Sequence, residues 1–247
     1  MKIAAAQFTP VPGDIEANVR SMADLIRAAS GQGARLVVFP ELAVTGYELK
    51  LIADDPGLCV AQDDPRLEPV RNACRATSAA AVVNCAARTP GGRPTIASLV
   101  VGPDGELLTR YDKLHLHGDE LDLFEAGTED GRFTLDGVRF ALAICYDNRF
   151  PELAERARAD DCRVYVASSA LEVGNDSFDV VYPVRARDNG LYVVLANPVG
   201  RNEVGECGGG SAIWGPDGGV RADAGAESPG LAVAELPNWG SAPRTAA

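Results

Sequence analysis

Three side chains that could act together in acyl transfer each follow a strand-like run of the sequence. Cys145 follows the apolar run 140–144, Glu41 follows the almost wholly apolar run 35–39, and Lys113 follows a third predicted strand. A thiol near neutral pH needs a base before it attacks, and the oxyanion that forms at a carbonyl or nitrile carbon needs donors. We therefore interpret Glu41 as the base for Cys145, and Lys113 as the cation that lowers the thiol pKa and stabilises the oxyanion.

Each of the three residues also has an ordinary structural interpretation. A single cysteine at a strand end is often a small buried hydrophobic residue. A glutamate after Phe39-Pro40 can be a cap or turn residue, and a single lysine is commonly a solvated surface residue. Spacing alone therefore leaves the catalytic interpretation as a hypothesis.

Composition and charge exclude some classes of partner. The chain has 247 residues, of which 46% are hydrophobic and 23% charged, and its formal net charge is −12. Nucleic acids and anionic membranes attract basic patches, so we expect neither as a partner. No apolar run approaches the roughly 18 residues of a membrane span, and the apolar start of the chain is too short for a signal peptide. We expect a cytoplasmic protein.

The cysteine and histidine spacings do not indicate a metal centre. Six cysteines lie at positions 59, 74, 85, 145, 162 and 207, and none of their spacings is CxxC, so we expect free thiols. His115 and His117 form a His-x-His pair, which is an alternative metal site without obvious further ligands. We expect neither a metal nor an organic cofactor.

The pattern of apolar residues predicts a mixed chain of strands and helices. Helices are expected from Asp14 to about Gly31 and over 65–78, 151–160 and about 177–189. Strands are expected at 2–8, 35–39, 80–87, 95–101, 106–110, 133–135, 138–145, 164–168 and 191–196, with two or three more within 210–235. This order favours one α/β domain over 1–235, in which two sheets pack together with helices outside, and a C-terminal tail over 236–247.

Three motifs contain the proposed catalytic residues: Phe39-Pro-Glu-Leu42 with Thr45-Gly-Tyr47, Tyr111-Asp-Lys-Leu-His-Leu116, and Cys145-Tyr-Asp-Asn-Arg-Phe-Pro-Glu152. In this order they resemble the three signatures of the nitrilase superfamily, whose members are carbon-nitrogen hydrolases with a Glu-Lys-Cys triad. The resemblance extends to about residue 235 through Ala5 to Gln7, Arg187-Asp-Asn189, Ala196-Asn197, Gly200, Gly210-Ser211 and Gly215-Pro-Asp-Gly218.

The resemblance implies a fold, a substrate class and an assembly. The fold would be a four-layer αββα sandwich, often paired into a homodimer whose helical layers continue across both subunits. The substrate would be a small amide-type molecule. Glu41 would be the general base, Lys113 would stabilise the tetrahedral intermediate, and Cys145 would be the nucleophile.

Further site residues follow from the same resemblance. The backbone N–H of Tyr146 would be a second oxyanion donor. Many members carry another glutamate shortly after the lysine, which positions the substrate or the attacking water, and Glu120 fits that place better than Glu125. Tyr47, Tyr146 and Ser168 are the expected substrate-binding residues.

Two segments depart from the family pattern or need a separate explanation. The stretch Ser168-Ser-Ala-Leu-Glu172 stands where many relatives carry an Asn-Trp-Pro-like sequence, so the substrate contacts of relatives do not transfer to it. Asn148 stands where a leucine is common, and the sequence does not explain it. In the same motif, we expect Arg149 and Glu152 to form an ion pair that shapes the corner.

The expected reaction is hydrolysis of a small amide or N-carbamoyl compound through a thioester on Cys145. Nitrile hydrolysis at the same site and a catalytically silent binding scaffold of this fold are alternatives. The run Gly208-Gly-Gly-Ser211 suggests a further one, a serine amidase with Ser211 as its nucleophile. A nucleotide-binding fold is disfavoured because neither GxGxxG nor GxxxxGK[ST] occurs.

Overall fold

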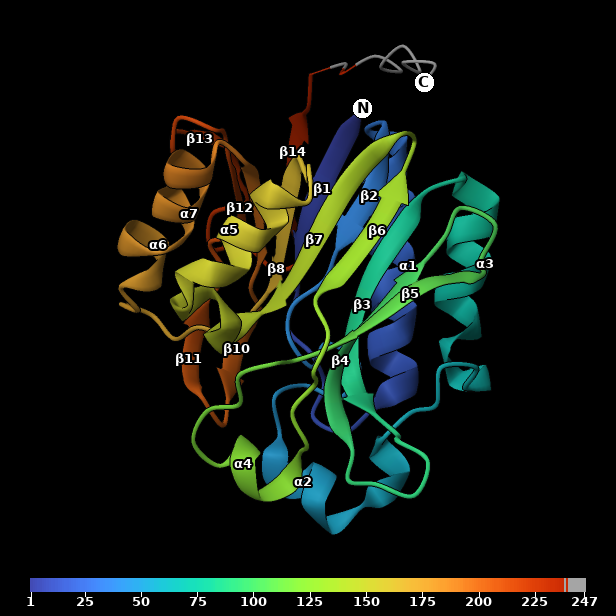
Figure 1. The fold of residues 1–247 in the computed structure, drawn as a ribbon. Helices are drawn as coiled ribbons and strands as arrows, with labels where there is room; N and C mark the ends of the chain where they lie inside the picture. The colour runs from blue at the N-terminus through green and yellow to red at the C-terminus, as the bar shows by residue number, and fades with distance from the viewer. Residues whose placement is uncertain (238, 240–247) are drawn as a thin grey trace, which may run out of the picture.

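Two six-stranded sheets of mixed direction pack face to face at the centre of the fold (Figure 1). The structure is a computed structural model that describes residues 1–237 and 239. The first sheet has the order β14-β1-β2-β3-β4-β5, with strands at Gly230–Glu235, Lys2–Gln7, Ala34–Val38, Ala80–Ala87, Thr95–Val101 and Leu107–Asp112. The second has the order β13-β12-β9-β8-β7-β6, with strands at Val220–Asp223, Ala212–Trp214, Tyr192–Ala196, Val164–Ser168, Val138–Ile144 and Gly131–Leu135.

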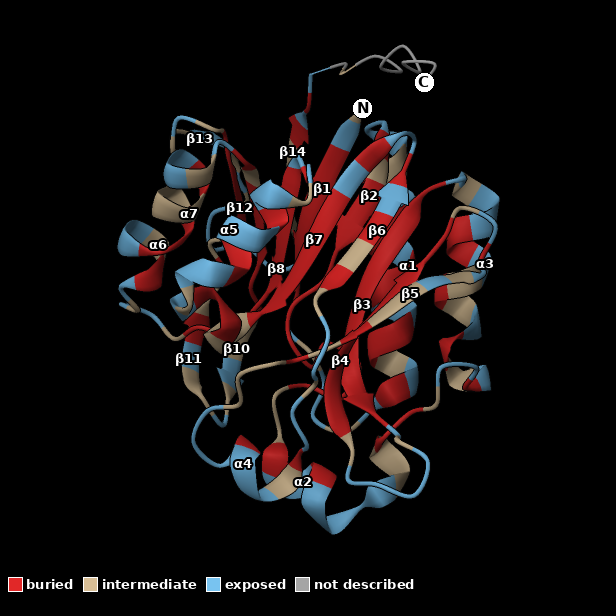
Figure 2. Cartoon of the chain, viewed as in Figure 1, coloured by how far each residue is buried: buried red, intermediate tan, exposed pale blue. Residues whose placement is uncertain are grey.

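Alternating side chains along each strand fill two different cores. In β2, Leu36 and Val38 lie between the sheets, whereas Val37 faces the helices. In β8, Val166 lies between the sheets and Tyr165 faces the other helical layer. Figure 2 shows that the central strands are buried along nearly their whole length. Burial on both faces explains why these strands are continuous apolar runs in the sequence.

Helices cover the outer faces of both sheets. The first sheet carries α1 (Ile15–Gly31) and α3 (Glu68–Thr77), and the second carries α5 (Pro151–Ala159), α6 (Ser177–Val180) and α7 (Tyr182–Asn189). The Asp14 side chain caps α1 by accepting from Ala17 N–H. The expected αββα sandwich is therefore confirmed. Within residues 1–237, no helix is both long and apolar enough to cross a bilayer.

Several elements differ from the prediction. The helix expected over about 177–189 is two helices, because Pro183 has no N–H to continue a single helix and lies in the first turn of α7. The stretch expected as one helix from 65 begins with a 3₁₀ turn, Pro65–Leu67. Elements that were not predicted are α2 (Leu49–Asp54), a 3₁₀ turn at Pro56–Leu58, α4 (Glu120–Leu123), and a hairpin of β10 (Val199–Asn202) and β11 (Gly205–Gly208). The hairpin is polar and rich in glycine, so its sequence carries no apolar alternation.

The first and last strands of the fold are neighbours. β14 runs antiparallel to β1, with Glu235 opposite Lys2 and Gly230 opposite Gln7. The predicted C-terminal tail, 236–247, lies mostly outside the described residues.

Candidate active site

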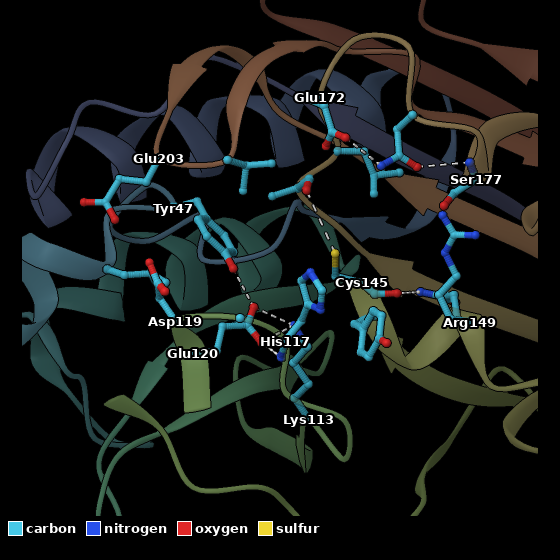
Figure 3. A pocket seen from close by; sticks show the side chains of 18 of the residues that line it. Tyr47, Lys113, His117, Asp119, Glu120, Cys145, Arg149, Glu172, Ser177 and Glu203 are labelled. Atoms are coloured by element: carbon cyan, nitrogen blue, oxygen red, sulfur yellow. Dashed lines mark hydrogen bonds and ion pairs between the residues drawn. The ribbon is translucent and has the colours of Figure 1, made fainter. Parts of the chain in front are cut away.

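Four residues expected to be catalytic converge at a cavity of about 810 Å³. Lys113, Glu120 and Cys145 line the cavity, and Glu41 contacts the Lys113 ammonium group. β7 delivers Cys145 at its carboxyl end, and the chain directly after β5 delivers Lys113. Figure 3 shows how the Lys113, Glu120 and Cys145 side chains approach one region of the cavity from different segments.

Lys113 is held between two carboxylates. Its Nζ donates to Glu41 Oε1 at 2.7 Å and to the two Glu120 oxygens at 2.7 and 2.8 Å. None of the three residues is more than 1% exposed. The buried ammonium group is thus both ion-paired and hydrogen-bonded, as a charge in a protein interior must be.

Glu120 is itself fixed by further donors. The Tyr47 hydroxyl donates to Oε1 at 2.6 Å, and the backbone N–H of His117 donates to Oε2 at 2.9 Å. Figure 3 shows the Tyr47 side chain directed at Glu120. Glu125, the other candidate from the sequence, does not line this cavity. Glu120 therefore links Tyr47 to Lys113 and fixes the ammonium position.

Cys145 occupies a strained corner between β7 and the 3₁₀ turn Cys145–Arg149. Its φ of 44° is in the left-handed region, which residues other than glycine rarely adopt. Its Sγ lies 3.9 Å from the carbonyl oxygen of Ala170. Cys145 is partly exposed, whereas the other five cysteines are buried. The backbone thus presents this thiol to the cavity.

Asp147 connects the cysteine corner to the chain around Lys113, a role that the sequence analysis missed. Its Oδ2 accepts from the Tyr111 hydroxyl at 2.7 Å and from Ile144 N–H at 3.0 Å. Its Oδ1 accepts from His115 N–H at 2.9 Å and lies 2.9 Å from His115 Nδ1. The residue is fully buried. The signal in the sequence was an acidic residue two positions after the nucleophile, where a turn was the simpler interpretation.

Burial dominates the electrostatics of the site. It raises the pKa of Glu41 to about 7, an effect that Lys113 partly offsets and Glu120 reinforces. Burial, followed by the charge of Glu41, also raises the pKa of the Cys145 thiol well above its usual value, and Lys113 offsets only part of that rise. Burial alone lowers the pKa of Lys113, but the neighbouring Glu41, Cys145 and Glu120 charges raise it overall. At rest the site holds a protonated thiol near a carboxyl group that titrates close to neutral pH.

Of the three expected substrate-binding residues, Tyr47 and Tyr146 line the cavity and Ser168 does not. The alternation of β8 puts Ser168 on the same face as Val166, which packs between the sheets, and leaves it 1% exposed. Ser168 is therefore not among the residues that line this cavity. The wall is built by the residues after it, at 170–172.

Charged residues line the outer part of the cavity, and Arg149 is among them. Its guanidinium group pairs with Asp176 and not with Glu152, so the expected ion pair was wrong. Glu152 is exposed in the first turn of α5, where a negative side chain stabilises the helix N-terminus. The remaining charged residues around the outer part are Lys50, Asp119, Glu172 and Glu203.

Ser211 is not placed to act as a nucleophile. It is 0% exposed, and its hydroxyl donates to the Asn197 carbonyl at 3.2 Å and accepts from Asn197 N–H at 2.9 Å. Gly209, in the glycine run before it, has a φ of 72°, and a Cβ there would lie 2.7 Å from Gln7 Nε2. The run therefore permits close backbone packing, which argues against the serine amidase alternative.

The His-x-His pair takes part in packing. The His115 ring stacks on Phe150 at a centroid distance of 3.6 Å, and the His117 ring lies 4.5 Å from the ring of Tyr146. Among the residues that the structure describes, no group of three or more His, Cys, Asp or Glu side chains could hold a metal ion.

Comparisons with known proteins agree with this fold and cavity. A family model described as carbon-nitrogen hydrolase matches residues 2–244. The omega-amidase NIT2 of Bos taurus is 31% identical over 223 residues, which cover 85% of this chain and 79% of that protein. A mutant of the amidase from Nesterenkonia sp. AN1, solved in complex with butyramide, is 30% identical and superposes with a TM-score of 0.87 over 96% of this chain and 91% of that chain. A second mutant of that amidase, with the same identity and TM-score over 96% of this chain and 90% of its own, shows covalent addition of the acetamide moiety of fluoroacetamide at its active site cysteine.

The sandwich fold, the cysteine-containing cavity and these relatives define a class of enzyme. The chain belongs to the carbon-nitrogen hydrolase family, in the nitrilase superfamily. It is an amidase-type hydrolase, and the resemblance predicted from the three sequence motifs is confirmed.

Proposed function

We propose that this enzyme hydrolyses small amides through a thioester on Cys145, with Glu41 as general base and Lys113 as oxyanion donor. One observation carries the proposal: the Cys145 thiol, whose pKa is raised well above its usual value, shares a site with a carboxyl group whose pKa is about 7. A group that titrates near the working pH can accept a proton and return it within one turnover.

In the first stage, Cys145 attacks the amide carbon while its thiol proton passes to Glu41. The carbonyl oxygen becomes an oxyanion, which accepts hydrogen bonds from Lys113 Nζ and from the backbone N–H of Tyr146. When the tetrahedral intermediate collapses, the carbon–nitrogen bond breaks, and Glu41 gives the proton to the departing ammonia. The acyl group remains as a thioester.

In the second stage, water replaces ammonia. Glu41 takes a proton from the water as its oxygen attacks the thioester carbon, and the same two donors stabilise the second oxyanion. The carbon–sulfur bond then breaks, the acid leaves, and Cys145 regains its proton from Glu41. In this mechanism Glu120 holds the Lys113 ammonium in place and Tyr47 holds Glu120, which agrees with the hydrogen bonds of Glu120 to both residues.

We propose an amide rather than a nitrile as the substrate. The named relatives are amidases, and one of them binds butyramide. The described residues around the cavity include both cationic and anionic side chains on its outer part, so their charges do not by themselves select an aliphatic amide, an ω-amide or an N-carbamoyl compound.

A substrate panel with a nucleophile variant tests the proposal. Purified enzyme is incubated with butyramide, an ω-amide, an N-carbamoyl amine and butyronitrile, and ammonia release is measured. We expect turnover of at least one amide, and complete loss of it in Cys145→Ala.

A second measurement identifies the nucleophile chemically. Iodoacetamide should alkylate Cys145 in the folded enzyme ahead of the other five thiols, which are buried, and butyramide should slow the alkylation. An active Cys145→Ala enzyme, or preferential labelling of another cysteine, would refute the assignment.

A further inference from the structure

Three sequence stretches that resemble the family have no role in the mechanism above, and they meet behind the cavity wall. They contain Gln7, Asn197 and Ser211, all fully buried. Ser211 N–H donates to Gln7 Oε1 at 2.9 Å, and the Ser211 hydroxyl contacts both the N–H and the carbonyl of Asn197. The three residues thus form one hydrogen-bonded chain that ends at the Asn197 side chain.

The Asn197 side chain hydrogen-bonds both backbone polar groups of one residue in the cavity wall, Leu171. Its Oδ1 accepts from Leu171 N–H at 2.7 Å, and its Nδ2 donates to the Leu171 carbonyl at 3.1 Å and to the Gly209 carbonyl at 2.8 Å. These three hydrogen bonds involve both the oxygen and the nitrogen of the side-chain amide. Leu171 lines the cavity, so Asn197 fixes the backbone of the wall from behind.

The bond to Leu171 N–H also orients a carbonyl that faces the nucleophile. Leu171 N–H and the Ala170 carbonyl belong to one planar peptide unit, in which the two groups point in opposite directions. With its N–H directed at Asn197, this unit turns the Ala170 oxygen toward Cys145 Sγ, at 3.9 Å. The preceding carbonyl, that of Ser169, accepts from Glu41 N–H at 3.1 Å and joins the same wall to the base.

We propose that Asn197 is a positioning residue that makes the enzyme select amides over esters, through the Ala170 carbonyl. This inference rests on the proposed attack by Cys145. When the thiol proton moves to Glu41, the Ala170 oxygen loses the donor it faces. An amide substrate supplies an N–H in its place, whereas the alkoxy oxygen of an ester presents only lone pairs, so a fixed carbonyl favours the amide.

The test compares two substrates with the same acyl group, butyramide and methyl butyrate, in Asn197→Ala. Without the Asn197 side chain, the Ala170–Leu171 peptide loses its hydrogen bonds and can rotate. The ratio of kcat/KM for amide over ester should therefore fall about tenfold, as expected for loss of one oriented hydrogen bond. A purely structural residue would lower both rates together and leave the ratio unchanged.

Asn18 provides a matched control. Its side chain bonds both backbone polar groups of Val11 in the same way. Oδ1 accepts from Val11 N–H at 2.7 Å, and Nδ2 donates to the carbonyls of Val11 and Val44 at 2.9 and 3.1 Å. Neither Val11 nor Val44 lines the cavity. Asn18→Ala should therefore lose thermal stability, as we also expect of Asn197→Ala, but keep the amide-to-ester ratio within about twofold of the wild type.

Ser211→Ala is a milder second variant in case Asn197→Ala fails to fold. It removes the hydroxyl that holds the Asn197 backbone and should shift the ratio in the same direction, by about threefold. An unchanged ratio in the folded variants, or an equal shift in Asn18→Ala, overturns the inference while leaving the proposed function intact. A wild-type enzyme that hydrolyses no amide of the panel described under the proposed function, and no matching ester, overturns both.

Discussion

At the scale of single residues, the acid–base pair explains why the thiol needs a partner. Lys113 lowers the pKa of Cys145, as the sequence suggested, but burial and the charge of Glu41 have the larger effect and keep the thiol protonated. A free thiolate is therefore not stored at the corner. In the proposed mechanism the proton moves to Glu41 as the carbon–sulfur bond forms, so the ionisation state of Glu41 would control acylation.

The pH dependence of acylation follows from that pair. Glu41 accepts a proton only when it is ionised, and its pKa is raised to about 7, so lower pH converts it into the inactive acid form. We expect kcat/KM for butyramide to fall about tenfold per pH unit below pH ~7 and to level off above it. Initial rates measured between about pH 5 and pH 8 check this, and a flat profile across that range would exclude Glu41 as the base.

At the scale of elements, the catalytic residues depend on how strand ends are tied to one another. The nucleophile lies at the end of β7 in the second sheet, and Lys113 directly follows β5 in the first. Asp147 joins these two segments, because it accepts from Ile144 on one side and from Tyr111 and His115 on the other. One carboxylate thus links the segment that carries the thiol to the segment that carries the ammonium group.

Asp147→Asn tests this link. An amide at this position directs an NH₂ group at donors that now meet a carboxylate oxygen, so the corner should shift relative to Lys113. We expect kcat for butyramide to fall about 100-fold, the effect of a displacement of about 1 Å at a catalytic group.

Tyr111→Phe serves as the graded control for that variant, because it removes a single donor to Asp147. Its kcat should fall about tenfold or less. Steady-state kinetics with circular dichroism spectra of both variants separate misplacement from unfolding. A folded Asp147→Asn enzyme with wild-type kcat would mean that the link has no catalytic role.

At the scale of the whole molecule, we propose that two copies associate through their helical layers. The proposal rests on the superfamily resemblance and on a large apolar side chain, Val180 of α6, which is 52% exposed on that layer. We expect light scattering after gel filtration to give twice the mass of one chain. Val180→Glu should shift the population toward monomer, and a wild-type monomer at micromolar concentration would contradict the proposal.

Much of this molecule follows from local sequence. Apolar runs buried on both faces identified most of the central strands, and polar residues directly after them identified Glu41, Lys113 and Cys145. Those features depend on short stretches of chain. The order of elements already favoured two packed sheets with helices outside, and the resemblance to a family gave the four-layer αββα sandwich and the choice of Glu120.

The features that sequence reasoning missed depend on register or on distant contacts. Ser168 was expected to bind substrate, but the strand alternation turns it away from the cavity, and residues 170–172 line the cavity instead. Arg149 forms its ion pair with Asp176, which is 27 residues away in the sequence. Asn197 hydrogen-bonds Leu171, which is 26 residues away in the sequence, and no local sequence pattern predicts that hydrogen bond.

The pairing of β1 with β14 has a consequence for how the enzyme is made. β1 lies between β2 and β14 in the sheet. During synthesis, one edge of β1 is therefore unpaired until residues 230–235 have left the ribosome. Until then its row of backbone N–H and C=O groups is open to pairing with other nascent chains. Glu41 follows β2, the strand next to β1, so the sheet that positions the proposed base is complete only after this last strand has paired.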